Sequence, residues 1–315
     1  MIKVFKQVDS SPTRIDVVIG CGLIGEALCE AIRQRPYAPN KLVLQCATDW
    51  SKASSLEKQL VDMRPTLQTL RESLHAAETH FYWCAGRAGF SATEDDIRSE
   101  LSNFERVLRW AEQHTALSRS FHMLSSAGGL HEGQTRCDDP SRLQLSRPYA
   151  RLKRDQEVLL EHSTLDQKFI YRLSSVFGLA KPGQRFGLIP TIIQNGLNRR
   201  TTTIFADAST QRDFISSTDV ATFIANDASS DDAFHDGEDT RYYYLASGIP
   251  CTIWEIHMKL ERLLSRDIAV NYTVNKDNFQ STTFSPSMLP EHWRCHPVQH
   301  QLGLLCHLIT GKPGI

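Results

Sequence analysis

The chain has 315 residues, enough for about two domains of roughly 150 residues and for a sizeable buried core. Its 35 Lys and Arg nearly balance its 36 Asp and Glu, and the formal net charge of -1 argues against a nucleic-acid-binding protein or a basic membrane-binding surface. With 41% hydrophobic and 23% charged residues, the composition excludes bulk disorder. No apolar run approaches the ~18–20 residues of a membrane span, and residues 1–16 lack the apolar core of a signal peptide, so we expect a cytoplasmic protein.

The eight cysteines include no CxxC pair, so we expect reduced, mostly buried thiols and no metal site. His292, Cys295, His296 and His300 gather near the C-terminus. Because neighbouring prolines make that segment loop-like, we do not expect it to bind a metal.

The first half alternates apolar runs with amphipathic segments, the pattern of a parallel sheet covered by helices. Strands are predicted at 15–19, 41–47, 59–63, 80–85, 120–125 and 168–176. Helices are predicted at 23–33, from Pro65 to about 75, at 94–114 and at 149–162, with a polar loop at 128–146.

Beyond Gly178 the predicted elements become shorter. Helices are expected at 188–197, 218–226 and 253–264, strands at 203–206, 212–216, 242–246 and 269–274, and an exposed acidic loop at 227–240. We therefore predict an α/β protein with a large nucleotide-binding part and a smaller, less regular second part.

A predicted strand, a GxGxxG sequence and a predicted helix follow one another at the start of the chain. In a dinucleotide-binding turn, Gly20 would permit the tight bend, Gly22 would let the backbone approach a pyrophosphate, and Gly25 would let the helix pack closely on the sheet. The start of the helix would offer unpaired N–H donors and a partial positive charge to the phosphates. The alternative is a turn in which the glycines serve packing alone.

A dinucleotide-binding turn is usually followed, about 20 residues later, by an acidic residue that binds the adenine ribose. In this chain Gln45 occupies the position where that aspartate is expected. Asp49 follows shortly and favours NAD, whereas the nearby Lys52 suits the extra phosphate of NADP. Both are equally explained as solvated loop charges.

Tyr149 and Lys153 form a YxxxK sequence whose spacing puts both side chains on one face of a helix. A lysine ammonium stabilises the phenolate and makes tyrosine a better base at neutral pH. Ser126, at the end of a predicted strand, can hydrogen-bond a substrate oxygen while Tyr149 moves the proton. A second YxxxK, at Tyr272 and Lys276, lies in a strand-like run, and we interpret it as a chance match.

Together these motifs resemble the extended short-chain dehydrogenases/reductases, of the NAD-dependent epimerase/dehydratase family, over residues from about 15 to 289. IGCGLIG is similar to the glycine turn, MLSSAGGL to the strand-end serine motif, and PYARLK to the tyrosine–lysine helix. YRLSSVFG is similar to the sixth strand, and TIFADASTQRDFISSTDVA to the stretch that carries a phosphate-contacting arginine, here Arg212.

The resemblance implies a Rossmann-type doubly wound parallel sheet with a smaller C-terminal substrate-binding domain. Residues 1–178 would bind NAD or NADP and carry catalysis, and 179–315 would mainly bind substrate, with segments such as 212–226 returning to the first domain. Members are commonly homodimers that pair the helices of Glu94 and Tyr149. A nucleotide sugar is the implied partner, with no nucleic acid and no membrane.

The resemblance also assigns roles to individual residues. It makes Tyr149 the general acid/base, Ser126 its partner on the substrate oxygen, and Lys153 the residue that holds the phenolate and the nicotinamide ribose. The residues that it places at the cofactor are Gly20, Gly22, Leu23, Ile24, Gly25, Asp49, Asp62, Cys84, Ala85, Gly86, Tyr149 and Lys153, and those at the substrate are Ser126, Ser175 and Arg212.

Departures from the family pattern narrow the activity. Ala127 and Gly128 stand where dehydratases usually carry Asp-Glu, which disfavours elimination of water, and Ser175 replaces a common asparagine. The second family arginine is missing, with Lys276 or Arg294 as possible substitutes. We therefore expect hydride transfer on a hydroxyl or ketone of a nucleotide-activated sugar. The alternatives are reduction of a small carbonyl compound with the same residues and a non-catalytic dinucleotide sensor.

Overall fold

The computed structural model describes residues 1–7, 14–35, 40–73, 78–114, 118–179, 187–227, 239–274 and 280–311. Among these residues, none of the helices combines the length and apolar character that a bilayer crossing requires.

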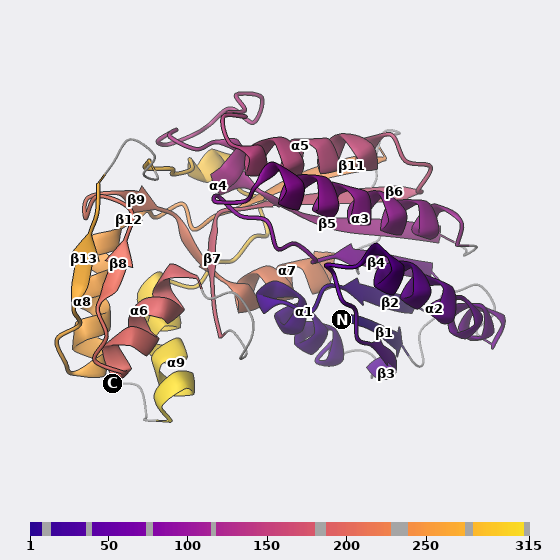
Figure 1. Cartoon of the computed structure of the whole chain (residues 1–315), viewed down its shortest axis with the longest axis horizontal. Coiled ribbons are helices and arrows are strands. Elements are labelled where there is room, and N and C mark those ends of the chain that lie inside the picture. The colour runs from indigo at the N-terminus through magenta and orange to yellow at the C-terminus, as the bar shows by residue number, and fades with distance from the viewer. Residues whose placement is uncertain are drawn as a thin grey trace.

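A seven-stranded, mostly parallel sheet forms the centre of the protein, in the order β11-β6-β5-β4-β2-β1-β3 (Figure 1). The parallel strands are β2 (Arg14–Ile19), β4 (Glu78–Trp83), β5 (Ser118–Ser126), β6 (Gln167–Leu173) and β11 (Thr240–Leu245). Because successive strand residues point to opposite faces, Phe81 and Trp83 enter one hydrophobic core while Tyr82 enters the other. Both faces are therefore covered, as predicted for a Rossmann-type sheet.

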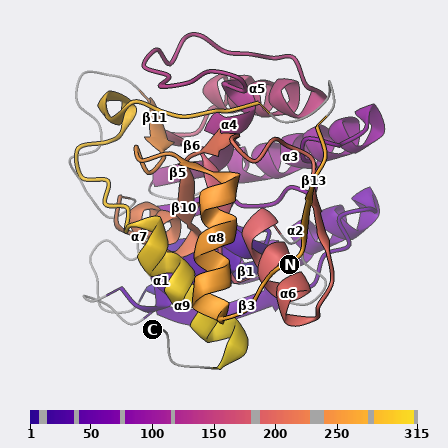
Figure 2. The ribbon, with the colours of Figure 1, turned by 90° about the vertical axis from the view of Figure 1, so that its left-hand side faces the viewer.

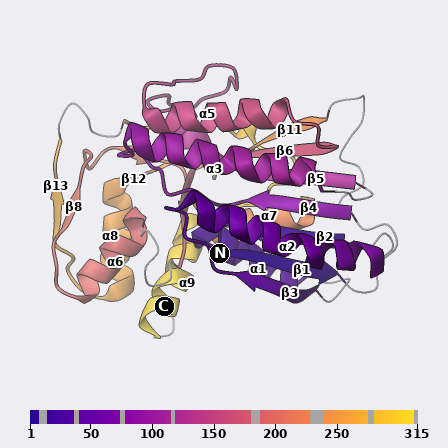
Figure 3. The same ribbon diagram turned by 45° about the vertical axis from the view of Figure 1, so that its right-hand side comes forward.

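Helices cover the two faces of this sheet. The helices α2 (Ala53–Ser73), α3 (Glu94–Glu112) and α5 (Pro148–Glu161) lie on one face, and α1 (Leu23–Arg33) and α7 (Ser217–Asp227) pack against each other on the opposite face (Figure 3).

The N-terminal segment forms a strand to which the sequence had assigned no role. Strand β1 (Ile2–Gln7) runs antiparallel between β2 and β3 (Asn40–Cys46). Since neighbouring strands lie about 4.8 Å apart, β3 lies roughly 10 Å from the glycine strand β2 instead of beside it. The backbone oxygen of Met1 accepts a hydrogen bond from the Gly20 N–H at 3.0 Å, so β1 begins beside the glycine turn.

The strand predicted at 59–63 was wrong, because these residues lie inside α2. Pro65 also lies within that helix rather than in its first turn. The apolar run is too short to distinguish a strand from a helix by itself. Leu56, Leu60 and Met63 recur at helical spacing and are buried in the core beneath α2, which decides the outcome.

The second part of the chain builds a smaller body beside one end of the sheet, on the left in Figure 1 and facing the viewer in Figure 2. It contains α6 (Leu188–Leu197), α8 (Ile253–Leu264) and α9 (Val298–Thr310), whereas the 3-10 helix at Pro286–Met288 packs near α4 (Ala127–Leu130) and the end of β11. Three two-stranded sheets accompany them: β7 (Ser175–Phe177) with β10 (Phe214–Ser216), β9 (Gln211–Arg212) with β12 (Cys251–Thr252), and β8 (Thr202–Ile204) with β13 (Val270–Tyr272).

Several predicted boundaries shift in detail. The single strands expected at 168–176 and 212–216 are each split in two, and α4 (Ala127–Leu130) extends into the loop predicted at 128–146. The acidic loop predicted at 227–240 falls mostly on 228–238, outside the described residues. Although α7 and β11 follow Gly178 in the chain, both belong to the central sheet and its covering layer. The assignment of substrate binding to the second part stays a prediction.

Candidate functional site

Two of the three glycines of the turn have no room for a side chain, whereas the third has open space beside it. Gly20 has φ +96°, and a Cβ there would lie 2.3 Å from the Ala85 nitrogen. A Cβ on Gly25 would lie 2.0 Å from the Gly20 oxygen, whereas one on Gly22 would meet nothing within 4 Å. Gly20 and Gly25 are therefore required by packing, and Gly22 faces open space.

The first turn of α1 supplies the donors that this space needs. Gly22 is the N-cap and provides no side-chain hydrogen bond, so the first N–H groups of the helix, including those of Leu23 and Ile24, lack intrahelical partners. Such a helix start favours an anion. The open space at Gly22 and these donors fit the pyrophosphate of a dinucleotide.

The segment after β4 lies beside the glycine turn, and contact of Cys84, Ala85 and Gly86 with the cofactor stays a prediction. The Cys84 N–H donates to the Ile19 oxygen at 2.8 Å, and a Cβ on Gly25 would lie 3.2 Å from the Cys84 Cβ. Burial raises the pKa of the Cys84 thiol. Cys84 is therefore a neutral thiol in the wall of the site, followed by Ala85 and Gly86.

Ser126, Tyr149 and Lys153 come together at the end of β5 and the start of α5. The Ser126 Oγ caps α4 and accepts a hydrogen bond from the Gly129 N–H at 3.0 Å. A Cβ on Gly129 would lie 2.9 Å from the Tyr149 Cε1 and 3.2 Å from the Ser126 Oγ, so both side chains border the same glycine. The Lys153 Nζ lies 5.8 Å from the centre of the Tyr149 ring. The structure thus gathers the three residues that the sequence singled out.

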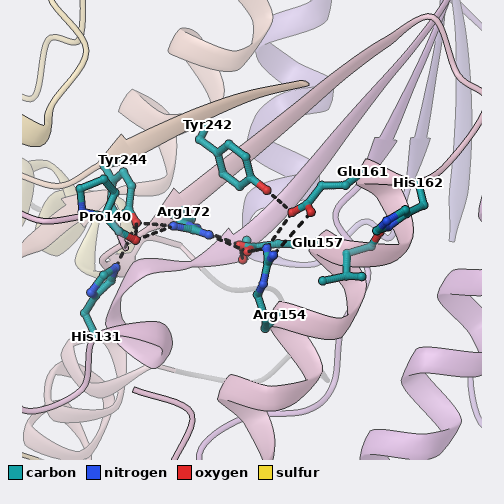
Figure 4. A network of polar contacts seen from close by, with 11 residues as sticks. His131, Pro140, Arg154, Glu157, Glu161, His162, Arg172, Tyr242 and Tyr244 are labelled. Atoms are coloured by element: carbon teal, nitrogen blue, oxygen red, sulfur yellow. Dashed lines mark hydrogen bonds and ion pairs between the residues drawn. The ribbon is translucent and has the colours of Figure 1, made fainter. Parts of the chain in front are cut away.

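A buried ion pair fixes the helix that carries Tyr149 and Lys153. From α5, Glu157 points toward Arg172 of β6 (Figure 4), and its carboxylate accepts from the Arg172 Nε at 2.9 Å and Nη2 at 2.7 Å. Ser125 donates to the same carboxylate at 2.6 Å, directly beside Ser126. Burial by itself would lower the pKa of Arg172, but the hydrogen bonds and charge of Glu157 raise it. The pair therefore ties α5 to the strand ends on which the site is built.

The same network reaches the loop after α4. Arg172 also donates to the hydroxyl of Tyr244 in β11, and a ring nitrogen of the buried His131 lies 3.0 Å from that hydroxyl. Arg154 and Glu161 continue the network along α5 toward Tyr242 (Figure 4).

Of the predicted substrate residues, Ser175 lies on β7 and Arg212 ends β9, two residues before β10, the strand that pairs with β7. The Ser175 N–H donates to the Asp213 oxygen at 2.9 Å, and the Arg212 guanidinium donates to the Gln211 oxygen at 2.9 Å and to the Gln280 oxygen. Burial lowers the pKa of Arg212 to about 10, although Glu132 acts in the opposite direction. The structure therefore brings Ser175 close to Arg212.

A second arginine that sequence reasoning missed lies near Arg212. Arg147 precedes α5 and forms an ion pair with Glu132 at 2.5 Å. Its guanidinium lies 5.7 Å from the Phe90 ring centre, and Phe90 packs on Tyr149 at 5.5 Å between ring centres. Like burial, the charge of Arg147 lowers the pKa of Arg212. No local pattern marks Arg147, because its neighbours come from distant parts of the chain.

Glu100 is a further residue that the sequence analysis missed. It lies on α3 and is 8% exposed, and its Oε1 is 3.8 Å from the Lys153 Nζ. A signal was present in the sequence, because Glu100 interrupts the apolar stripe of Ile97 and Phe104 on the predicted helix.

The residues predicted at the adenine end are more scattered. Asp49 is exposed in the turn before α2, where hydrogen bonds from Ser51 lower the pKa of its carboxyl, and it forms an ion pair with Lys52 at 3.4 Å. Asp62 is exposed on α2. Burial, followed by the charge of Asp62, raises the pKa of Cys46, which places Asp62 near the end of β3. Contact of either aspartate with the cofactor stays a prediction.

The remaining candidates lie elsewhere. Arg294 donates to the backbone oxygens of Glu291 and Trp293 in the C-terminal segment, and Lys276 falls outside the described residues. Tyr272 of the second YxxxK lies on β13, with its hydroxyl 3.3 Å from a ring nitrogen of His257.

No group of three or more His, Cys, Asp or Glu side chains in the described part of the chain is arranged to hold a metal ion. Within the predicted C-terminal cluster, the His296 Nδ1 lies 2.6 Å from the Asp219 Oδ1, and the His296 ring stacks on that of His300.

Comparisons with solved structures agree with this fold. The UDP-glucose 4-epimerase of Thermus thermophilus in complex with NAD is 17% identical, has a TM-score of 0.70, and is matched over 93% of this chain and 97% of its own. MoeE5 in complex with UDP-glucuronic acid and NAD is 18% identical, with a TM-score of 0.69 over 91% of this chain and 96% of its own. At these identities the likeness shows the fold alone.

A search of curated proteins gave no significant match. A family model described as the NAD dependent epimerase/dehydratase family matches residues 17–238, well over half of the chain and from the glycine strand past the predicted tyrosine and lysine. With the glycine turn and the confirmed Rossmann-type sheet, this match establishes the chain as a member of the NAD dependent epimerase/dehydratase family of enzymes.

Proposed function

We propose that the protein acts by hydride transfer on a hydroxyl or ketone of a nucleotide-activated sugar, with Tyr149 as the general acid/base. The observation that carries this proposal is the meeting of Ser126 and Tyr149 at Gly129, with Lys153 one helical turn further along α5. The Tyr149 hydroxyl forms no hydrogen bond with other described residues, so it is available to a substrate oxygen.

Bound NAD supplies the acceptor and donor of the hydride. The open space at Gly22 and the N–H groups at the start of α1 would hold its pyrophosphate. During oxidation Tyr149 takes the proton of the substrate hydroxyl, and during reduction it returns that proton to the oxygen. Ser126 holds the same oxygen, and the Lys153 ammonium stabilises the phenolate.

The nucleotide-sugar part of the proposal depends on charge near Tyr149. A diphosphate needs more than one donor group, and the sequence offered only Arg212 with certainty. Arg147 lies on the tyrosine side of the site and close enough to lower the pKa of Arg212. MoeE5 is described with UDP-glucuronic acid and the Thermus thermophilus neighbour as a UDP-glucose epimerase, which supports the same class of substrate.

Net epimerisation or reduction fits the site better than elimination. Ala127 and Gly128, which follow Ser126, carry no carboxylate that could remove a proton from carbon.

A ligand screen and two tyrosine variants test the proposal. NAD, NADP and the diphosphates UDP, GDP and dTDP are added singly and in pairs while the unfolding midpoint is measured, because a ligand that binds only the folded state raises it. We expect a rise with NAD and a further rise with one nucleoside diphosphate. A response to NAD alone would instead favour a small-carbonyl reductase.

Tyr149→Phe is expected to abolish turnover while leaving NAD affinity nearly unchanged. The matched control is Tyr272→Phe, in the second YxxxK, which should retain activity. Full turnover by Tyr149→Phe would exclude the proposed proton transfer. Arg212→Ala should weaken the nucleoside diphosphate far more than NAD, and equal weakening of both would show that Arg212 is structural.

We also propose a homodimer formed through α3 and α5. These helices lie side by side on the outer layer and are joined by an ion pair at 2.8 Å between Glu94 and Arg151. Light scattering on the purified protein should give twice the chain mass, and a single-chain mass at micromolar concentration would contradict the proposal.

A further inference from the structure

Glu100 is a buried carboxylate between two parts of the site that come from distant segments. Its Oε2 accepts hydrogen bonds from the Arg87 and Ala88 N–H groups, both at 2.9 Å, and so holds the loop that follows β4. Its Oε1 is buried and has no hydrogen-bond partner among the described residues, but lies 3.8 Å from the Lys153 Nζ.

Space around Glu100 is restricted. A Cβ on Gly86 would lie 3.0 Å from the Glu100 Oε1, so the loop passes directly over the carboxylate. Lys153 is 5% exposed, and besides facing Glu100 it donates to the Gln156 Oε1 at 3.1 Å and to the Leu124 oxygen at 3.4 Å. An ammonium has three donors, and these two acceptors leave one for a further partner.

Burying a carboxylate is unfavourable unless hydrogen bonds and an opposite charge compensate for lost hydration. Two backbone amides and the Lys153 ammonium are the groups that meet this need here. A purely structural role in holding the loop would use Oε2 alone. Such a role would not explain why the Glu100 Oε1 is buried beside the Lys153 ammonium.

We propose that Glu100 is a positioning residue. Its carboxylate holds the Lys153 ammonium beside Tyr149 and weakens the electrostatic effect of that ammonium on the tyrosine, while it also holds the loop after β4 at Arg87 and Ala88. This inference rests on the proposed roles of Tyr149 and Lys153. The negative charge of Glu100 partly offsets the ammonium, so it opposes the stabilisation of the Tyr149 phenolate. Glu100 thereby sets the pH at which the tyrosine becomes an effective base.

Glu100→Gln separates the two contacts. One amide oxygen can still accept from both loop N–H groups, since Oε2 alone does so in the native protein, while the charge beside Lys153 is lost. We expect the acid limb of the pH–rate profile to move to lower pH by roughly 0.5–1 unit, the effect of a nearby unit charge at the effective dielectric of a protein site. NAD affinity should change less than threefold.

A second readout does not depend on turnover. The ultraviolet absorbance of ionised tyrosine is titrated in the presence of NAD, and the difference from the same background carrying Tyr149→Phe isolates one phenolate. This signal should move to lower pH in Glu100→Gln by the same amount as the rate profile. Glu105→Gln is the matched control, because Glu105 is a partly exposed carboxylate on the same helix that pairs with Arg109, and its loss should move neither curve.

Two further variants cover the loop contact and the possibility that Glu100→Gln does not fold. Glu100→Ala removes both contacts and should weaken NAD binding by roughly tenfold, about the worth of one hydrogen bond to a charged group. Glu100→Asp keeps the charge but shortens its reach, so it should retain the native pH profile while binding NAD less tightly. A profile shift in Glu100→Asp as large as the one predicted for Glu100→Gln would refute the electrostatic role.

The inference is overturned if Glu100→Gln leaves both the rate profile and the tyrosinate titration unchanged while Tyr149→Phe remains inactive. In that case Glu100 only holds the loop. If Tyr149→Phe is active, the proposed function itself fails, and the two failures are therefore distinguishable.

Discussion

Replacing Gly22 by alanine separates cofactor binding from folding at the glycine turn. Gly22 has φ -80° and ψ -157°, and an added Cβ would meet no atom within 4 Å, so the folded chain accepts the methyl group. Alanine is a poorer N-cap than glycine by roughly 0.5–1 kcal/mol. It also restricts the unfolded chain, which returns about 0.4–1 kcal/mol. The free energy of unfolding should therefore change by less than about 0.5 kcal/mol, or under ~2 °C in the unfolding midpoint.

The effect on NAD should be much larger. The methyl group would occupy the open space that the pyrophosphate needs, whereas NAD at 100 times its dissociation constant stabilises the native protein by about 2.7 kcal/mol. We expect Gly22→Ala to lose nearly all of this stabilisation. The assay is thermal unfolding with and without NAD, at the concentration that saturates the native protein.

Gly25→Ala is the matched contrast. Its Cβ would lie 2.0 Å from the Gly20 oxygen, so backbone must move, and the midpoint without ligand should fall by the equivalent of about 1–3 kcal/mol. An unchanged NAD response in Gly22→Ala would refute our interpretation and leave the glycines as a packing turn. A large loss of stability in Gly22→Ala without ligand would show that the space at Gly22 is not open.

Three further predictions concern the framework around the site. Glu157→Leu should lower the free energy of unfolding by about 3–5 kcal/mol, because it leaves Arg172 buried without its ion-pair partner. The double variant with Arg172→Leu should lose clearly less than the sum of the two single losses, and additive losses in denaturant titrations would contradict the coupling. Burial holds the pKa of His80 and His122 well below 6.5, so the unfolded chain takes up protons that the folded chain refuses, and stability should fall as pH drops below about 6.5. The two histidines together should remove on the order of 3 kcal/mol between pH 7.5 and 5.5, and a His122→Phe variant with the full native slope would refute this. Trp293→Ala should lower the free energy of unfolding by about 3–5 kcal/mol, because this buried ring packs on the core beneath α7 and donates to the Ala246 oxygen at 2.7 Å. Unchanged stability would show that the C-terminal segment is not part of that core.

Elements set by nearby residues could be predicted from the sequence. Helix α8 has its predicted bounds because Thr252 and Glu255 form a capping box at its start, and the apolar positions that follow repeat at helical spacing. The glycine turn is similarly local, since Gly20 must bend back and Gly25 must approach the turn within six residues. Tyr149 and Lys153 share a helix face through their spacing alone.

Other features depended on contacts that no local pattern contains. The run at 59–63 became part of a helix because its neighbours Leu56 and Leu67 are buried in the same core at helical spacing. Strand β1 lies between β2 and β3 and satisfies backbone groups of both, and its pairing of Ile2 with Cys46 of β3 joins residues far apart in the chain.

The sequence by itself therefore determined the family, the Rossmann-type sheet and the set of Ser126, Tyr149 and Lys153, because each is written in short motifs or in hydrophobic periodicity. Only the tertiary structure decided what surrounds that set. The approach of Glu100 to Lys153 and of Arg147 to Arg212 joins residues more than 50 positions apart. Electrostatic interactions act through space, so the charges that tune a site are known only when the chain has folded around it.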